Sequence, residues 1–122
     1  MNQAKLIGNL GADPVIKPAA NGKEAAFFSI ATNDRWKDKA TGELREDVQW
    51  HQIAVFEPSL VALAKSQLRK GSFVHIEGRI ANRKWQDSDG NERLSSQIIV
   101  SGPQAALTLV DRRPENTVGR GR

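Results

Sequence analysis

Three tryptophans lie in polar stretches of the sequence. Their surroundings read Asp34-Arg35-Trp36-Lys37, Val48-Gln49-Trp50-His51 and Arg83-Lys84-Trp85-Gln86. An indole ring offers a flat π face on which any nucleic-acid base can stack, and neighbouring Lys or Arg side chains can bind the adjacent phosphates. Arg can add a cation–π attraction. These residue types therefore predict a platform for unpaired nucleic-acid bases.

The other aromatic residues are four phenylalanines. We expect Phe73 and one of Phe27 and Phe28 in the core, because buried Phe is common. A single Trp in polar surroundings is explained equally well as an amphipathic anchor at a surface or subunit interface. Three such Trp residues in one small domain favour the base-stacking interpretation.

Residues that could carry catalysis or bind a metal are few and scattered. The two histidines, His51 and His75, lie 24 positions apart in predicted strands, and the chain has no Cys. No glycine-rich loop leads into a helix as a phosphate-binding loop requires. Asp87 and Asp89 resemble the start of a calcium-binding loop, but the rest of that pattern is absent and they suit a hairpin turn. We therefore expect no enzyme activity, no metal site and no cofactor.

The composition is typical of one globular domain with a weak basic excess. The 122 residues are 39% hydrophobic and 26% charged, with a net charge of +4. Residues 1–110 carry 14 basic and 12 acidic side chains, and residues 111–122 carry four Arg and two acids. This excess does not by itself indicate nucleic acid, since the position of the cations decides. No apolar run approaches the roughly 20 residues of a spanning helix, and the absence of Cys fits a cytoplasmic protein.

Alternating apolar residues and turn residues predict strands interrupted by one helix. The predicted strands are residues 2–10, 25–32, 45–56, 73–80 and 93–100, with a short extension of the sheet at 105–110. Asn21-Gly22 is a strong hairpin signal. The helix begins at Pro58 and ends at Gly71, and its apolar positions are Leu60, Leu63, Ala64 and Leu68.

Three strands, a helix and two strands form the order of the OB fold, a five-stranded Greek-key barrel. SH3-like barrels share much of this order. The predicted fold class is therefore all-β with one short helix. We expect an OB-fold domain over residues 1–110 and a basic, disordered tail over residues 111–122.

Several linked motifs resemble the bacterial single-stranded-DNA-binding protein family over most of residues 2–100. The motifs are Gly8-Asn9-Leu10-Gly11, Asp13-Pro14, Asn21-Gly22, Trp36-Lys37-Asp38-Lys39-Ala40-Thr41-Gly42-Glu43, Glu46 to Trp50-His51, Phe56, Leu68-Arg69-Lys70-Gly71-Ser72, Ile76-Glu77-Gly78 and Arg83-Lys84-Trp85. The resemblance implies binding and protection of single-stranded DNA, without sequence preference, during replication, recombination and repair. It also implies a cytoplasmic location at the nucleoid.

The resemblance further implies which residues contact DNA and which contact other subunits. The implied base-stacking positions are Trp36, Trp50, Phe56 and Trp85. The implied phosphate contacts are Lys17, Lys37, Lys39, Arg69, Lys70, Arg83 and Lys84. The family is typically homotetrameric, with DNA wrapped around the outside, and the implied subunit contacts are Asn2, Leu6, Gly8 and His51.

The sequence departs from the family pattern at two places. Gln3-Ala4-Lys5 interrupts the apolar run that is usual in the family's first strand. Most bacterial members end in a disordered linker and an acidic tip close to Asp-Ile-Pro-Phe, whereas this chain ends Val118-Gly119-Arg120-Gly121-Arg122. We therefore do not expect this chain to bind the repair and replication proteins that recognise the acidic tip.

Three other functions fit parts of the sequence. A primosome-type OB accessory protein would recognise protein partners as a dimer, but the three Trp and Arg83-Lys84-Trp85 argue against it. An RNA-binding or RNA-chaperone barrel stays open, because no pattern in the sequence senses a 2′-hydroxyl. A nuclease or other OB-fold enzyme is disfavoured by the lack of metal-ligand spacing.

Overall fold

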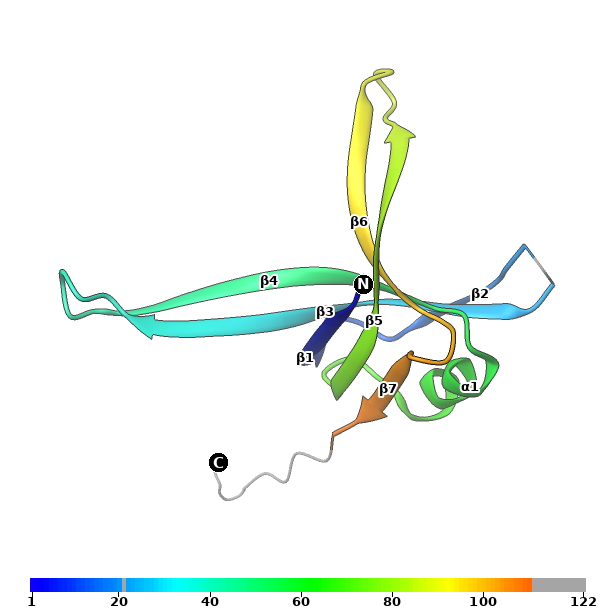
Figure 1. Cartoon of the computed structure of the whole chain (residues 1–122), viewed down its shortest axis with the longest axis horizontal. Helices are drawn as coiled ribbons and strands as arrows, with labels where there is room; N and C mark the ends of the chain where they lie inside the picture. The colour runs from blue at the N-terminus through cyan, green and yellow to red at the C-terminus, as the bar shows by residue number, and fades with distance from the viewer. Residues whose placement is uncertain (21, 111–122) are drawn as a thin grey trace.

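The computed structural model describes residues 1–20 and 22–110. Figure 1 shows a small β-barrel with two long hairpins and one helix. The elements are β1 (Ala4–Leu10), β2 (Val15–Pro18), β3 (Glu24–Lys37), β4 (Leu44–Val55), α1 (Pro58–Gln67), β5 (Phe73–Gln86), β6 (Glu92–Val100) and β7 (Ala106–Leu109). The predicted tail over residues 111–122 and Asn21 of the predicted hairpin turn lie outside the described residues.

Five of these strands close into a barrel. They are hydrogen-bonded in the order β1-β3-β4-β6-β5, and β5 pairs again with β1. Only β4 and β6 run parallel in this ring, with Ile53 opposite Ile98. The helix lies between β4 and β5 in the chain, so the order of elements and the closure confirm the predicted OB fold. The short strands β2 and β7 pair with β3 and β5, and β2 was not among the predicted strands.

Alternate apolar side chains from the strands fill the barrel interior. The fully buried members include Ile30, Ile53, Val55, Val74, Ile76 and Val100. Helix α1 packs against this cluster through Val61 and Ala64, and Leu68 follows it into the core. Burial of each such side chain contributes about 1.5–3 kcal/mol to folding.

Two glycines lie where strands approach most closely in the closed barrel. A Cβ on Gly8 would lie 2.2 Å from the carbonyl oxygen of Ala31, where β1 meets β3. A Cβ on Gly78 would lie 2.5 Å from the carbonyl oxygen of Ile99. At Gly78 the strand β5 leaves its pairing with β1 and continues against β6. The motifs around these glycines thus serve barrel closure, because no side chain fits at either position.

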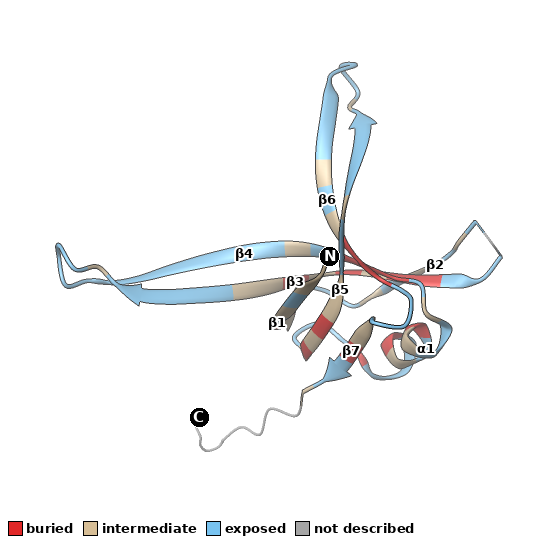
Figure 2. Cartoon of the chain, in the orientation of Figure 1, coloured by how far each residue is buried: buried red, intermediate tan, exposed pale blue. Residues whose placement is uncertain are grey.

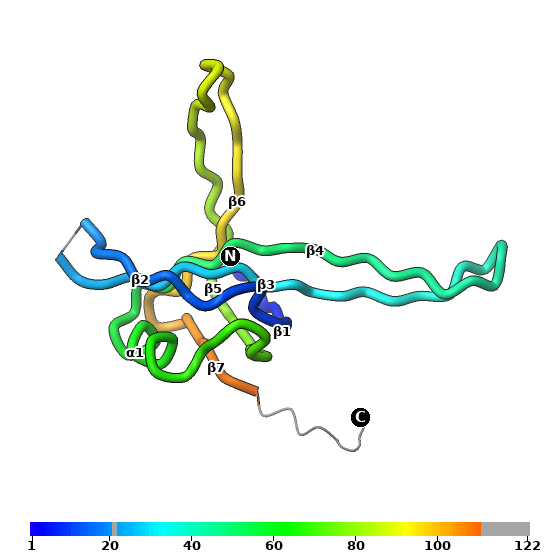
Figure 3. Tube along the Cα trace, turned by 180° about the vertical axis from the view of Figure 1, so that it is seen from behind, coloured from blue at the N-terminus to red at the C-terminus, as the bar shows by residue number. Residues whose placement is uncertain are grey.

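Two hairpins extend well beyond the barrel and form the β3–β4 arm (residues 32–49) and the β5–β6 arm (residues 82–96) (Figure 1). Figure 3 shows the same two arms from behind, projecting away from the barrel in different directions. In Figure 2 both arms are almost entirely exposed, whereas the buried residues gather where the strands cross and along the helix.

The arms make two strands longer than the sequence predicts. Strands predicted at 25–32 and 73–80 continue to Lys37 and Gln86. The ladders continue without interruption, and Arg35 on β3 forms an ion pair of 3.2 Å with Glu46 opposite it on β4. Residues 33–37 and 82–86 are exposed on both faces, so they carry no alternation of apolar and polar residues by which a strand is predicted.

The end of the helix also differs from the prediction. The helix ends at Gln67, and the following Leu68 is extended and fully buried. Gly71, predicted to stop the helix, instead has a φ of 90° in the turn that leads into β5. Burial of Leu68 in the core draws the chain out of the helix before Gly71 is reached. The guanidinium of Arg69 donates to the carbonyl oxygens of Lys65 and Leu68 and so caps the helix end.

Candidate nucleic-acid interface

The outward side chains of β3, β4, β6 and β5 form one surface, which we call the outer face. They alternate with the residues that fill the barrel interior. Ala25, Ala54 and Ile99 are buried but lie outside the core cluster, so they form the floor of this face. The larger side chains on it include Lys17, Phe27, Trp50, Phe56, Arg79, Arg83 and Trp85.

Phe56 and Phe27 contact each other on the outer face. Their ring centroids lie 6.1 Å apart with the planes at 88°, an edge-to-face arrangement. The ammonium of Lys17 lies 5.8 Å from the centroid of Phe27. Phe28 is buried in the core, so the prediction that one of the two adjacent Phe residues is a core residue is confirmed. Alternation along β3 puts the other, Phe27, on the outer face, where the sequence prediction assigned it no role.

Trp50 lies on the outer face at the start of the β3–β4 arm. It is paired with Ala31 across the ladder, and its indole lies against the backbone of Gly11. The backbone N–H of Gly11 donates to the carbonyl oxygen of Ser29, which fixes this loop against β3. The ring is thus confined at its Cζ3–Cη2 edge and is otherwise largely exposed, at 58%.

Trp36 lies on the opposite face of the same arm. The register pairs Trp36 with Arg45 and Ala31 with Trp50, five ladder positions apart, so the two indoles project from opposite faces of the ladder. Trp36 shares its face with Thr32 and His51, whose Oγ1 and Nε2 atoms lie 2.9 Å apart. The structure therefore does not bring all three Trp residues onto one face.

The cluster Arg83-Lys84-Trp85 is also divided between two faces. Arg83 and Trp85 are opposite Ser95 and Arg93 on the outer face, whereas Lys84 is opposite Leu94 on the other face. All four implied stacking residues are nevertheless accessible, with exposed fractions of 50% for Trp36, 58% for Trp50, 36% for Phe56 and 50% for Trp85. Exposed aromatic rings of this kind are available to a planar ligand.

The cations divide into those neutralised by acids and those that are not. The paired ones are Arg35 with Glu46, Arg45 with Asp38 and Glu43, Lys65 with Glu24, and Arg93 with Asp87. The side chains of Arg79 and Arg83 form no ion pair or hydrogen bond with residues 1–20 or 22–110. An unpaired cation on an aromatic face can bind a phosphate without first losing an acidic partner.

The other implied phosphate contacts are exposed but dispersed. Lys37 and Lys39 lie at the far end of the β3–β4 arm. Lys70 lies in the turn before β5, where its backbone N–H donates to Asp13. Arg69 is engaged with the carbonyl oxygens at the end of α1, so part of its donor capacity is already used.

Comparison with known proteins identifies the family. The model of the single-strand binding protein family matches residues 1–106. The chain belongs to this family. The single-stranded DNA-binding protein of Rhizobium meliloti (strain 1021) is 39% identical over 122 residues, covering 100% of this chain and 70% of the relative. That of Rickettsia prowazekii (strain Madrid E) is 36% identical over 123 residues, covering 99% and 81%.

A solved structure agrees with the fold. The Plasmodium falciparum SSB complex with ssDNA matches with a TM-score of 0.85 and 36% identity, covering 91% of this chain and 96% of that one. Family membership and this fold confirm the resemblance on which the sequence analysis relied. Membership also fits a binding function rather than an enzymatic one.

The implied subunit-contact residues of this family member lie along β1 and at the base of the β3–β4 arm. The Asn2 side chain donates to the carbonyl oxygen of Ile80 at 2.8 Å and accepts from its backbone N–H at 2.9 Å, two positions beyond the last β1–β5 ladder pair, Ala4 and Gly78. Leu6 is half-buried against the core, and Gly8 is buried by the Ala31 carbonyl of its own chain. His51 is half-buried beside Thr32.

Both arms end in the same kind of turn. Asp38 accepts from the N–H of Ala40 at 2.9 Å and from Arg45, and Asp87 accepts from the N–H of Asn91 at 2.9 Å and from Arg93. The Ala40 N–H is the main cause that lowers the pKa of Asp38, and Arg93 is the main cause that lowers the pKa of Asp87. The prediction that Asp87 belongs to a hairpin turn is confirmed.

No helix between residues 1 and 110, Asn21 aside, is long and apolar enough to cross a membrane. Within the same residues, no group of three or more His, Asp or Glu side chains is placed to hold a metal ion.

Proposed function

We propose that this chain binds single-stranded DNA without reading its sequence. The observation that carries the proposal is the outer face, which presents the exposed rings of Trp50, Phe56 and Trp85, and also Arg79 and Arg83, which have no ion pair among the described residues. Base–aromatic stacking contributes about 1–3 kcal/mol per base and tolerates every base, because each has a π face. The likeness to an SSB complex with ssDNA supports this assignment.

The same geometry explains why unpaired DNA is the preferred form. In a duplex the base faces are already stacked on one another, so an exposed indole has no face to contact. Cations supply a binding energy that depends on salt, through release of the counterions on each phosphate. Neither a ring face nor a cation reads the hydrogen-bond pattern of a base edge, so we expect little sequence preference.

The arms and the outer face together suggest how longer DNA is held. A single OB fold covers roughly 4–16 nucleotides. We therefore propose a homotetramer, in which β1 and His51 contribute to the subunit contacts and Trp36 extends the stacking surface across the assembly. Protection of exposed strands during replication, recombination and repair is the biological role we assign to it.

A fluorescence titration tests the proposed function. The chain has three Trp and no Tyr, so stacking of oligo-dT on the indoles is expected to quench most of the intrinsic emission. The titration is run with oligo-dT, a duplex of equal length and oligo-U, each at two salt concentrations. Tight, quenching binding of oligo-dT with weak duplex binding supports the proposal. Preferential binding of oligo-U favours the RNA-binding alternative, and no binding of either contradicts a nucleic-acid function.

A further inference from the structure

We infer that a groove beside Phe56 is a nucleotide subsite, in which Arg79 and Arg83 bind phosphates and Phe27 positions the Phe56 ring under a base. This inference rests on the proposed function and adds two residues to it, Arg79 and Phe27. Neither belongs to the stacking or phosphate positions implied by the family resemblance.

The groove lies on the outer face between the end of β4 and the paired strands β5 and β6. Its volume is about 480 Å³, and Phe56, Arg79, Ala81, Arg83, Gln97 and Ile99 line it. Sites for small ligands have volumes of about 300–1,000 Å³, so the space suits one nucleotide. The apolar floor from Ala81 and Ile99 suits a base, and the two guanidinium groups suit the charges of its backbone.

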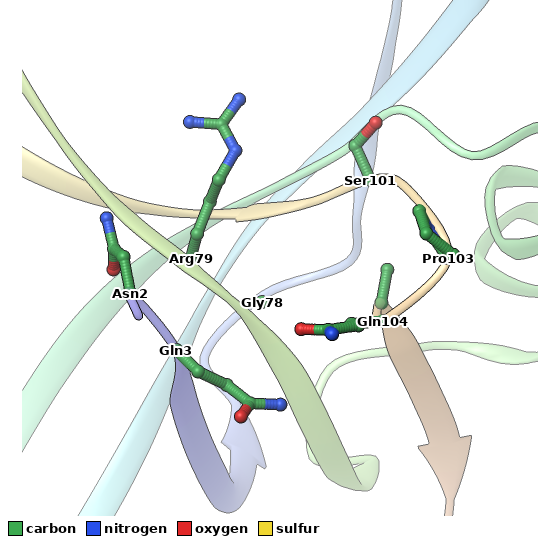
Figure 4. Close-up of a pocket in the computed structure, with 8 residues that line it drawn as sticks. Asn2, Gln3, Gly78, Arg79, Ser101, Pro103 and Gln104 are labelled. Atoms are coloured by element: carbon green, nitrogen blue, oxygen red, sulfur yellow. The ribbon is translucent and has the colours of Figure 1, made fainter.

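Arg79 is placed by the strand register rather than by a polar partner. It lies opposite Ile99, on the same face of β5 as Arg83 four residues later. In a strand, four residues span about 13 Å, so the two side chains can reach successive parts of one DNA backbone. Figure 4 draws a second pocket that shares Arg79 and Ser101 with this groove, and in it both side chains point away from that of Gln3.

The charge of Arg79 is uncompensated within the described part of the chain. Its guanidinium has no ion pair or hydrogen bond there, in contrast to Arg93 on the same face, which is held by Asp87 at 2.9 Å. A guanidinium is well suited to bidentate phosphate contacts. The groove therefore offers two free anion-binding groups beside an aromatic ring.

Phe27 acts through Phe56 in this subsite. The edge of one ring meets the face of the other at a centroid separation of 6.1 Å, which restricts the plane that Phe56 presents. Lys17 lies over Phe27 and contributes a further positive charge at this side of the groove. We therefore treat Phe27 as a positioning residue and Phe56 as the group that contacts the base.

The phosphate contact is tested by the salt dependence of binding to an oligo-dT of about eight nucleotides. Arg79→Ala is expected to lower the slope of log affinity against log salt by about 0.7, the value for one phosphate contact on a single strand. Arg79→Lys is expected to keep the slope, because the charge remains. Lys65→Ala is the matched control, since it removes an exposed cation that Glu24 already neutralises. An Arg79→Ala slope equal to that of wild type and Lys65→Ala overturns this part of the inference.

The positioning role is tested by a double-mutant cycle. Phe27→Leu retains an apolar side chain and is expected to weaken oligo-dT binding severalfold, because the Phe56 ring loses the edge-to-face contact that restricts its plane. In a Phe56→Ala background the same change is expected to have no further effect, because Phe27 acts only through Phe56. An equal loss in both backgrounds indicates a merely structural role and contradicts the inference. Failure of the wild type itself to bind oligo-dT contradicts the proposed function as well as the subsite.

Discussion

Gly11 lies against the edge of the Trp50 indole: a Cβ built on Gly11 lies 2.6 Å from Cζ3 and 2.9 Å from Cη2 of the ring. The loop between β1 and β2 therefore limits the position of an exposed aromatic ring on β4. A glycine is needed at position 11 because the Trp50 ring occupies the space that a Cβ would take. Backbone freedom is not the reason, because Gly11 does not have a positive φ. A small residue in a loop thus determines how a base can approach Trp50.

The first prediction concerns this contact. Gly11→Ala is expected to leave the fold intact but to displace the Trp50 ring, and so to weaken oligo-dT binding severalfold. Circular dichroism checks the fold, and the position of the Trp emission maximum reports the displaced ring. In a Trp50→Ala background, Gly11→Ala is expected to have no effect on binding. A loss that persists there contradicts the proposed role of Gly11.

The second prediction concerns the two Trp residues of the outer face. Trp50→Ala and Trp85→Ala are each expected to weaken oligo-dT binding about 5- to 150-fold, corresponding to 1–3 kcal/mol for a lost base stack. Trp→Phe at either position is expected to cost less, since a smaller π face remains. If the folded Trp50→Ala, Trp85→Ala double variant keeps wild-type affinity, base stacking is not the mechanism.

The third prediction separates Trp36 from Trp50. The two side chains project from opposite faces of the β3–β4 arm, so a short strand on the outer face does not reach both. We expect Trp36→Ala to change the affinity for an oligo-dT of about eight nucleotides less than twofold, and to weaken a strand several times longer more strongly. The comparison uses Trp50→Ala as the matched variant. Equal losses for both variants on the short strand contradict the assignment of faces.

The fourth prediction concerns assembly. Light scattering is expected to give close to four times the 13.4 kDa mass of the chain. His51→Arg removes the contact with Thr32 and places a bulky charge at the predicted subunit contact, so we expect partial dissociation. Binding of long strands is then expected to weaken through lost avidity, with little change for short ones. A stable monomer at micromolar concentration in the wild type rules out the tetramer.

The fifth prediction concerns the turns at the ends of the arms. The pKa of Asp38 and of Asp87 is lowered in the folded chain. A carboxyl group with a lowered folded pKa stabilises the fold above its unfolded pKa, near 4, and this contribution disappears as the pH falls through the folded value. We therefore expect both turns to stay ordered at pH 5–7 and to loosen below about pH 4.

Amide exchange measured by NMR over residues 38–43 and 87–91 follows this loosening at each turn. Asp87→Asn keeps a side-chain acceptor for the backbone N–H groups but loses the charge that binds Arg93. It is expected to abolish the pH dependence at the β5–β6 turn and to leave that of the β3–β4 turn unchanged. An unaltered titration at residues 87–91 shows that another group is responsible.

Much of the barrel follows from local sequence. The strands predicted at residues 25–32 and 45–56 include buried barrel segments, where burial favours apolar residues such as Ile30 and Val55. Asp and Gly at the turns have local conformational preferences, as the φ of 82° at Gly90 illustrates. Gly8 and Gly78 belong to motifs of the family, but only the structure shows the carbonyl groups that each approaches.

The sequence alone could not assign the residues of the arms to faces. Residues 33–37 and 82–86 are exposed on both sides, so they carry no apolar alternation. For this reason strand β5 was predicted to end at residue 80, before Arg83 and Lys84. The ladder register from the barrel then decides that Lys84 lies opposite Leu94 while Trp85 lies on the outer face.

The residue types alone indicated what this protein can bind. Its aromatic rings stand next to cations in the sequence, which suits unpaired nucleic acid, and the sequence offers no set of residues suited to catalysis. Tertiary structure decided which of those groups act together. It joins Phe27 to Phe56, leaves Arg79 without an acidic partner among the described residues, and separates Trp36 from Trp50. The physical reason is that a side chain's own preferences are local, whereas its neighbours are fixed by the pairing of strands that are distant in sequence.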